Sequence, residues 1–330
     1  MPLNPLDTPV TGTRLHTLAS EGHLSDTALE RALIFAEIIP PKHRWQTFLR
    51  GLLLMLGVTF ILAGVIFFFA YNWAQMGRFL KFGLLQAAIA ATVGISWYKG
   101  LEHLSGKLSL LMAAVLVGPL LAVYGQTYQT GADPYELFLG WAVLIVGWVV
   151  ISRFASLWVC WLLLLNISLI LYWTQILDME RWTFAGMCEA GFLLNASAIL
   201  VWEWLAAPKI PWLSGRWIPR LLLCASTAFL TIPTISCIFD YASEPFLLLA
   251  PILYFSFIAA CLWIYQRVIH DLFVLAVCLF SLIIIITAFF MEMLGEGFIF
   301  LMFYSFLIIV QTAAVVFWLR KVEKTWRDTA

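Results

Sequence analysis

The sequence predicts an all-α fold, a polytopic transmembrane helix bundle of about ten spans with a short N-terminal cytoplasmic helix pair. Three observations carry this prediction. Of the 330 residues, 63% are hydrophobic and 12% charged, whereas soluble domains carry about 25% charged residues. Apolar runs of about 20 residues, the length that crosses the hydrocarbon core as a helix, recur along most of the chain. Lysine and arginine collect mainly in every second loop between these runs.

Residues 12–38 precede the first apolar run and predict two short amphipathic helices. Leu15 belongs to the first helix, Gly22 breaks the pattern, Ser25 can cap the second helix, and the proline pair at 40–41 ends it. A pair this small cannot bury a core of its own. It should therefore pack on the membrane surface, on the cytoplasmic loops or on another protein.

Charge-free runs that end at Trp, Tyr, Lys or Arg predict the spans. They are expected near residues 51–71, 79–98, 108–127, 137–152, 154–174, 182–204, 217–239, 245–265, 271–291 and 297–319. The fourth run is short and its link to the fifth, around Arg153, is minimal, so these two form a tight hairpin or one is re-entrant. The expected organisation is a helix pair at 1–45, a transmembrane domain at 46–320 and a cytoplasmic tail at 321–330.

The loop charges predict the orientation of the chain. Sixteen of the 19 basic residues fall on one side of the ten spans, and only Arg78, Lys81 and Arg181 fall on the other. Because Lys and Arg next to spans collect on the cytoplasmic side, both termini are expected in the cytoplasm. The opposite side carries eight acidic residues: Asp133, Glu136, Asp178, Glu180, Asp240, Glu244, Glu292 and Glu296.

The inventory of reactive residues argues against an enzyme. All five histidines lie on or near the cytoplasmic side, and the chain has no H-E-x-x-H, no intramembrane aspartate pair and no G-x-x-x-x-G-K-[ST]. The six cysteines fall in apolar runs without a C-x-x-C pair, as packing residues do. We therefore expect no catalytic centre, cofactor or metal, and no nucleic-acid partner.

Glu189 is a carboxylate well inside a predicted span, about 10 Å below the outer interface when counted from Trp182. An ionised carboxylate at that depth costs several kcal/mol, unless it is paired with a cation or hydrated in a water-filled cavity. Protonation also removes the cost. Small neighbours such as Gly186 and Gly191 offer a face for close helix packing. Glu189 is thus either a protonated interhelical hydrogen-bonding group or an ion or proton site. Its candidate partners are Gln126, Gln175, Asn195 and Thr231.

The end of the third span is polar. Gln126, Tyr128 and Gln129 lie where hydrocarbon gives way to headgroups, and a turn ending in Asp133 and Pro134 follows. The aspartate can bond the backbone ahead of it, and the proline limits the helix on its far side. Two interpretations stay open: a capped outer hairpin anchored by interfacial aromatics, or a polar mouth facing the periplasm.

Two motifs carry a resemblance to a known family. They are Phe69-Ala70-Tyr71-Asn72-Trp73 at the end of the first span, and Gly125-Gln126-Thr127-Tyr128-Gln129 followed by Asp133, Leu137, Phe138 and Trp141. With the N-terminal helix pair, they resemble the bacterial multipass membrane proteins of domain-of-unknown-function family number 2157, over about residues 12–175. The resemblance implies a bacterial inner-membrane location and a shared architecture, and it assigns no reaction.

Two hypotheses for the function follow. The first is an inner-membrane protein, surrounded by membrane lipids, that binds or moves a small solute, ion or lipid-like molecule. Its outward-facing vestibule would be lined by Gln126, Tyr128, Gln129, Asp133 and Glu189. The acidic excess on that side favours a cation. The second is a non-transporting scaffold or envelope-stress component whose N-terminal helices recruit a cytoplasmic protein.

Overall fold

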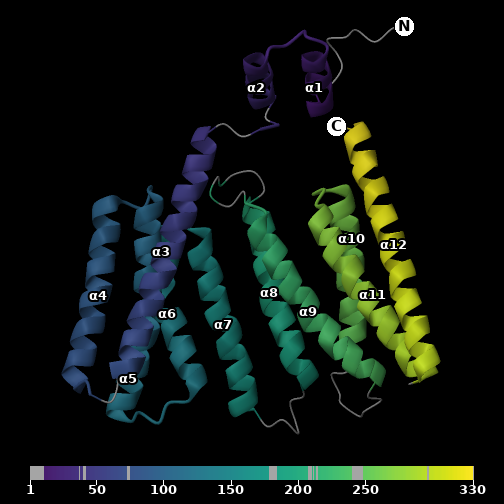
Figure 1. Cartoon of the computed structure of the whole chain (residues 1–330). Coiled ribbons are helices and arrows are strands. Elements are labelled where there is room, and N and C mark those ends of the chain that lie inside the picture. The colour runs from purple at the N-terminus through teal and green to yellow at the C-terminus, as the bar shows by residue number, and fades with distance from the viewer. Residues whose placement is uncertain are drawn as a thin grey trace. The chain divides into compact units, whose positions relative to one another are not determined.

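The computed structural model describes residues 11–36, 38–39, 42–72, 75–177, 184–206, 210, 212, 215–239, 248–295 and 297–329. These residues form twelve α-helices and no strand (Figure 1). The helices are α1 Gly12–Ser20, α2 Asp26–Phe35, α3 Lys42–Asn72, α4 Arg78–Lys99, α5 Leu104–Tyr128, α6 Pro134–Ser152, α7 Ala155–Gln175, α8 Phe184–Ala206, α9 Trp217–Phe239, α10 Leu249–Arg267, α11 Leu272–Leu294 and α12 Phe298–Thr329. Ten of them, α3 to α12, are long and apolar enough to cross a membrane, which confirms the predicted polytopic bundle.

Several residues used in the sequence argument lie outside the described part of the chain. They are the proline pair at 40–41, Trp73, Asp178, Glu180, Arg181, Trp182, Asp240, Glu244 and Glu296.

The chain divides into two compact units. The first comprises residues 1–77 and 90–112, and the second comprises residues 78–89 and 113–330. Helices α4 and α5 contribute to both.

In the first unit, α1 and α2 form the predicted helix pair. They pack against each other and bury Leu15 and Leu33. The Ser25 hydroxyl accepts a hydrogen bond from the Ala28 amide at 3.3 Å, which caps α2 as the sequence predicted. Gly22 lies between the helices with φ +81°, a left-handed conformation that glycine adopts at little cost.

Two membrane helices are longer than their apolar runs. α3 begins at Lys42, ahead of the predicted start at 51, and α12 continues to Thr329, beyond the predicted end at 319. Hydropathy marks where a helix leaves the hydrocarbon, but backbone hydrogen bonding continues through Lys, Arg and Glu, which are good helix formers. The Arg327 and Glu323 side chains, one turn apart, also pair on α12.

The short fourth run forms a complete helix. α6 and α7 have 19 and 21 residues, and Arg153, with φ +46°, turns the chain between them. The Trp161 indole donates to the Ala142 carbonyl at 3.1 Å, and the Ser168 hydroxyl donates to the Tyr135 carbonyl at 3.0 Å. Of the two arrangements that the sequence left open, the structure has the tight hairpin.

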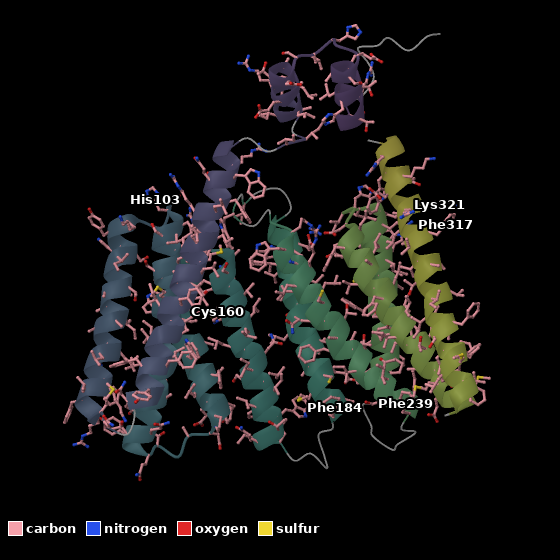
Figure 2. All side chains as sticks on the ribbon, in the orientation of Figure 1. His103, Cys160, Phe184, Phe239, Phe317 and Lys321 are labelled. Atoms are coloured by element: carbon pink, nitrogen blue, oxygen red, sulfur yellow. The ribbon has the colours of Figure 1, made fainter. Side chains whose placement is uncertain are left out.

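The core of the second unit centres on α9, which packs against α8, α10 and α11. Its buried face includes Ile218, Leu222 and Leu230, and Tyr254 of α10 is fully buried beside them. Figure 2 shows Phe184 and Phe239 at one end of this unit and Lys321 towards the other. The six cysteines are unpaired and none is classed as exposed, as expected of packing residues.

Candidate functional site

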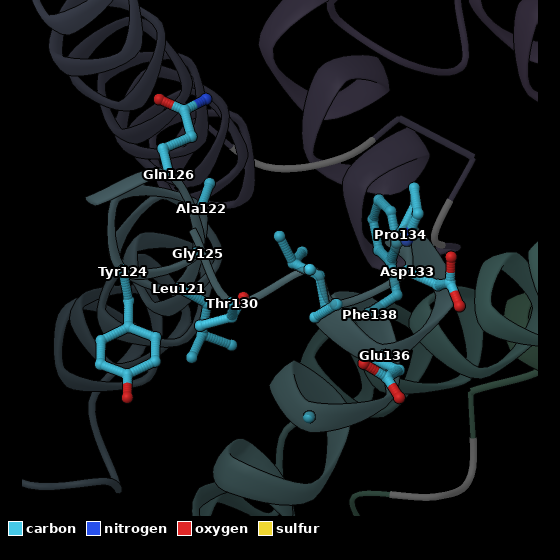
Figure 3. A pocket seen from close by; sticks show the side chains of 14 residues that line it. Leu121, Ala122, Tyr124, Gly125, Gln126, Thr130, Asp133, Pro134, Glu136 and Phe138 are labelled. Atoms are coloured by element: carbon cyan, nitrogen blue, oxygen red, sulfur yellow. The ribbon is translucent and has the colours of Figure 1, made fainter. Parts of the chain in front are cut away.

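A cavity of about 440 Å³ lies where α5 ends and α6 begins. Figure 3 shows Gln126, from α5, on one side of it and Asp133 and Glu136 on the other. Of the five residues predicted to form a vestibule, Gln126 and Asp133 line this cavity. Tyr128, Gln129 and Glu189 are not among its lining residues.

The turn at the cavity differs in one respect from the sequence prediction. Pro134 is the first residue of α6, where its missing amide hydrogen costs nothing, so it limits the helix as expected. The Asp133 carboxylate, however, makes no capping hydrogen bond. Tyr128 packs on Tyr124 with the ring centroids 4.9 Å apart, and Gln129 adopts a left-handed φ of +45°.

Deeper along α5 and α6, Trp141 closes the space between the two helices. Its indole donates to the Ala114 carbonyl at 2.7 Å. A methyl group added at Gly118 would overlap the Trp141 ring, so the glycine is what lets the ring lie against α5. Trp141 itself is not among the residues that line the cavity.

Glu189 lies on α8 and is 6% exposed. Its Oε1 atom is sealed from solvent and has no hydrogen-bond partner among the described residues. None of the four candidate partners binds this oxygen: Gln126 and Gln175 are exposed, the Asn195 amide bonds to Asn166 and to the Gly191 carbonyl, and the Thr231 hydroxyl donates to the Thr227 carbonyl. The neighbours Gly186, Cys188 and Gly191 are buried, so the small-residue face does pack closely.

The packing of α8 on α9 is closest at Gly191, two residues beyond Glu189. A methyl group at Gly191 would lie 2.7 Å from the Phe229 ring, so these two residues meet. Because α8 and α9 are consecutive helices packed side by side, Glu189 is level with about Thr231. Pro233 has no amide hydrogen, which leaves the Phe229 carbonyl without its helical donor. This adds a polar backbone group to the interior of α9.

Four hydroxyl residues of α9 are buried: Ser226, Thr227, Thr231 and Thr234. The hydroxyls of Ser226 and Thr227 have no partner within the described chain, like Oε1 of Glu189. We call these four residues, together with Glu189 and Asn195 of α8, the buried polar set. Three of its buried oxygens thus have unused hydrogen-bonding capacity, which is costly in a membrane interior.

Asn195, a member of this set, joins α8 to α7. Its amide donates to Asn166 Oδ1 at 2.7 Å, and the Asn166 amide donates back at 3.4 Å. Replacing Asn195 by leucine should lower the free energy of unfolding by about 0.6–2 kcal/mol, the range for hydrogen bonds between membrane helices. SDS-induced unfolding in mixed micelles measures this. A double-mutant cycle with Asn166→Leu should show non-additive losses, and strict additivity would contradict the pairing.

A charge cluster at the other end of α8 was not predicted as a unit. Arg216 donates to both oxygens of Glu203 at 3.0 and 2.9 Å and to Asp271 at 3.3 Å. Arg220 donates to both oxygens of Asp271 at 3.2 and 3.0 Å. The Tyr265 hydroxyl donates to Glu203 at 3.0 Å. The cluster joins α8, α9, α10 and α11.

Asp271 is the centre of the charge cluster, with its side chain 2% exposed. Burial by itself would raise the pKa of Asp271, but the hydrogen bond and charge of Arg220 and the charge of Arg216 lower it below its usual 3.8. Burial likewise opposes the charge of Arg216, yet Glu203 and Asp271 raise the pKa of that guanidinium. The sequence predicted only the helix cap at Asp271, which the Phe273 amide confirms at 3.1 Å.

The comparisons with known proteins bear on the first half of the chain. Residues 16–158 match the family model of DUF2157, a predicted membrane protein family. The resemblance that the sequence motifs carried is thereby confirmed over this segment. The DUF2157 segment includes the cavity and Trp141, whereas Glu189 and the charge cluster lie beyond it. No curated protein and no solved structure matches the chain.

Proposed function

We propose that this chain is a bacterial inner-membrane protein, with both termini in the cytoplasm, that binds and releases a proton at Glu189 while it moves a small solute. The observation that carries the proposal is the sealed, unpartnered Oε1 of Glu189 in a membrane-spanning helix. An ionised carboxylate without a partner costs several kcal/mol there, so the protonated form is favoured. Local opening would admit water and let the proton leave.

The geometry around Glu189 favours a proton over a larger cation. Solvent cannot touch Oε1. A cation would need several oxygen ligands, and Oε1 has no polar partner among the described residues, whereas a proton needs no coordination shell. The acidic excess that favoured a cation in the sequence concerns the outer loops, where it can attract either species.

The cavity lined by Gln126 and Asp133 supports a separate step, the entry of solute from outside. Its volume of about 440 Å³ falls in the range of small-molecule pockets. Trp141 would have to move for a solute to pass further between α5 and α6. Movement through this route therefore requires a second conformation.

Replacing Glu189 by glutamine tests the proposal, because the amide keeps the shape and cannot release a proton. The purified protein would be examined by infrared difference spectroscopy between acid and alkaline pH, and by proton flux into vesicles. We expect the mutant to lose a carboxyl C=O band and its proton flux. Glu292→Gln, at an exposed carboxylate of α11, is the matched control and should keep both the band of the buried carboxyl and the proton flux. An unchanged spectrum in Glu189→Gln would refute the proposal.

The scaffold hypothesis has its own supporting observation. Phe35 at the end of α2 is 92% exposed, and Ile38 and Ile39 are each 43% exposed. Apolar side chains grouped at one end of the helix pair can bind a partner protein. Deleting residues 1–40 separates the two functions. Loss of a co-purifying protein with intact flux favours the scaffold, and loss of flux with no such partner favours the first proposal.

A further inference from the structure

A cleft of about 400 Å³ lies between the end of α10 and α12. Its polar lining comes from Gln266, Arg267, His270, Lys321, Thr325 and Trp326. The Trp326 indole donates to the Gln266 carbonyl at 3.2 Å and joins the two helices. The His270 ring packs on Trp326 with centroids 4.9 Å apart, in a left-handed turn of φ +54°. The walls are thus fixed by specific contacts.

The cleft is cationic. Arg267 and Lys321 line it together with the His270 imidazole, and no acidic residue does. The nearest acidic side chains in sequence are already engaged, because Asp271 binds Arg216 and Arg220, and Glu323 binds Arg327. Within the described chain, neither Arg267 nor Lys321 forms an ion pair. An anionic group can therefore bind both without displacing a carboxylate.

The cleft lies at the edge of the hydrocarbon. The apolar run of α12 gives way to charge at Arg320 and Lys321, and that of α10 does so at Arg267. Trp318 and Trp326 line the same cleft, as tryptophans do at membrane interfaces. Figure 2 shows Phe317, which is 74% exposed, close to Lys321 on α12. An apolar chain can thus lie on α12 next to the cationic group.

We infer that this cleft binds the phosphate headgroup of an anionic membrane lipid. Arg267 and Lys321 bind the phosphate oxygens, Trp326 and His270 form the wall beside them, and the acyl chains run along the apolar surface of α12. Basic pockets between membrane helices on the cytoplasmic side bind such headgroups. The site lies outside the DUF2157 segment and does not depend on proton binding at Glu189.

The test compares lipid binding by the full-length protein, purified in neutral detergent. Native mass spectrometry would count retained molecules of phosphatidylglycerol and of phosphatidylcholine with the same acyl chains. The double variant Arg267→Gln/Lys321→Gln should bind phosphatidylglycerol about thirtyfold more weakly, from about fivefold per basic residue. Binding of phosphatidylcholine should not change.

Two further double variants make the result specific. Arg153→Gln/Lys324→Gln removes the same charge from exposed positions outside the cleft and should keep most of the phosphatidylglycerol affinity. Arg267→Lys/Lys321→Arg preserves the charge and should also retain the lipid. Equal losses in the two glutamine variants would overturn the site, because general charge attraction would then explain binding. Displacement of the lipid by millimolar inorganic phosphate would reassign the cleft to soluble phosphate and overturn the lipid assignment.

Discussion

Replacing Asp271 by alanine should lower the free energy of unfolding of the second unit by about 3 kcal/mol. The side chain is 2% exposed and binds two guanidinium groups, so its loss leaves Arg216 and Arg220 with unbalanced charge. Those arginines are 34% and 41% exposed, and partial rehydration keeps the loss at the lower end of the range for buried pairs. SDS-induced unfolding in mixed micelles measures the change.

Glu323→Ala is the control for Asp271→Ala. It removes a carboxylate from the Glu323–Arg327 pair on α12, where Arg327 is 77% exposed, so the loss should stay below about 1 kcal/mol. Similar losses in the two variants would show that the charge cluster contributes no more than a surface pair.

The stabilisation by Asp271 should also depend on pH. Because its folded-state pKa lies below the usual 3.8, the unfolded chain takes up the proton first as the pH falls. The contribution of Asp271 to the free energy of unfolding is therefore fully present above about pH 3.8. It decreases as the pH falls through the folded-state pKa of Asp271. Unfolding midpoints of the wild type and Asp271→Asn should converge at acid pH. A constant difference across that range would contradict the assignment.

Replacing Gly118 by alanine should cost about 3 kcal/mol, since overpacking is combined with loss of the Trp141–Ala114 hydrogen bond. The new methyl group would overlap a rigid indole ring, and the ring can leave only by giving up its 2.7 Å bond. The same unfolding assay applies. Gly147→Ala is the control, because a methyl group there meets nothing within 4 Å and alanine favours the helix.

A second substitution distinguishes the steric cause from a general loss of helix flexibility. In the Gly118→Ala background, Trp141→Leu should destabilise less than it does in the wild type, because removing the indole ring also removes its clash with the new methyl group. Additive losses would mean that the two residues do not compete for the same space.

The predicted vestibule residues show which features of the site could be predicted from the sequence. Gln126 and Asp133 are close in sequence, so the turn between α5 and α6 brought them to one cavity as expected. Glu189 was correctly located inside a span by counting from the apolar boundary. The absence of a hydrogen-bond partner for its Oε1 among the described residues could not be predicted, because the surroundings of a side chain depend on the rotation of α8 about its axis. The sequence indicated close packing at Gly191, but it did not identify Phe229 as the residue that meets it.

The sequence alone located the ten apolar runs that helices α3 to α12 follow, although it did not give the start of α3 or the end of α12. Hydrocarbon thickness sets a local length requirement, and each apolar run meets it without reference to any other part of the chain. Tertiary structure decided which polar groups meet. Asp271 and Arg220 are 51 residues apart and bind only because α9 and α11 pack side by side. Pairing of distant charges depends on helix packing and rotation, which are set by many weak contacts at once and leave no local pattern.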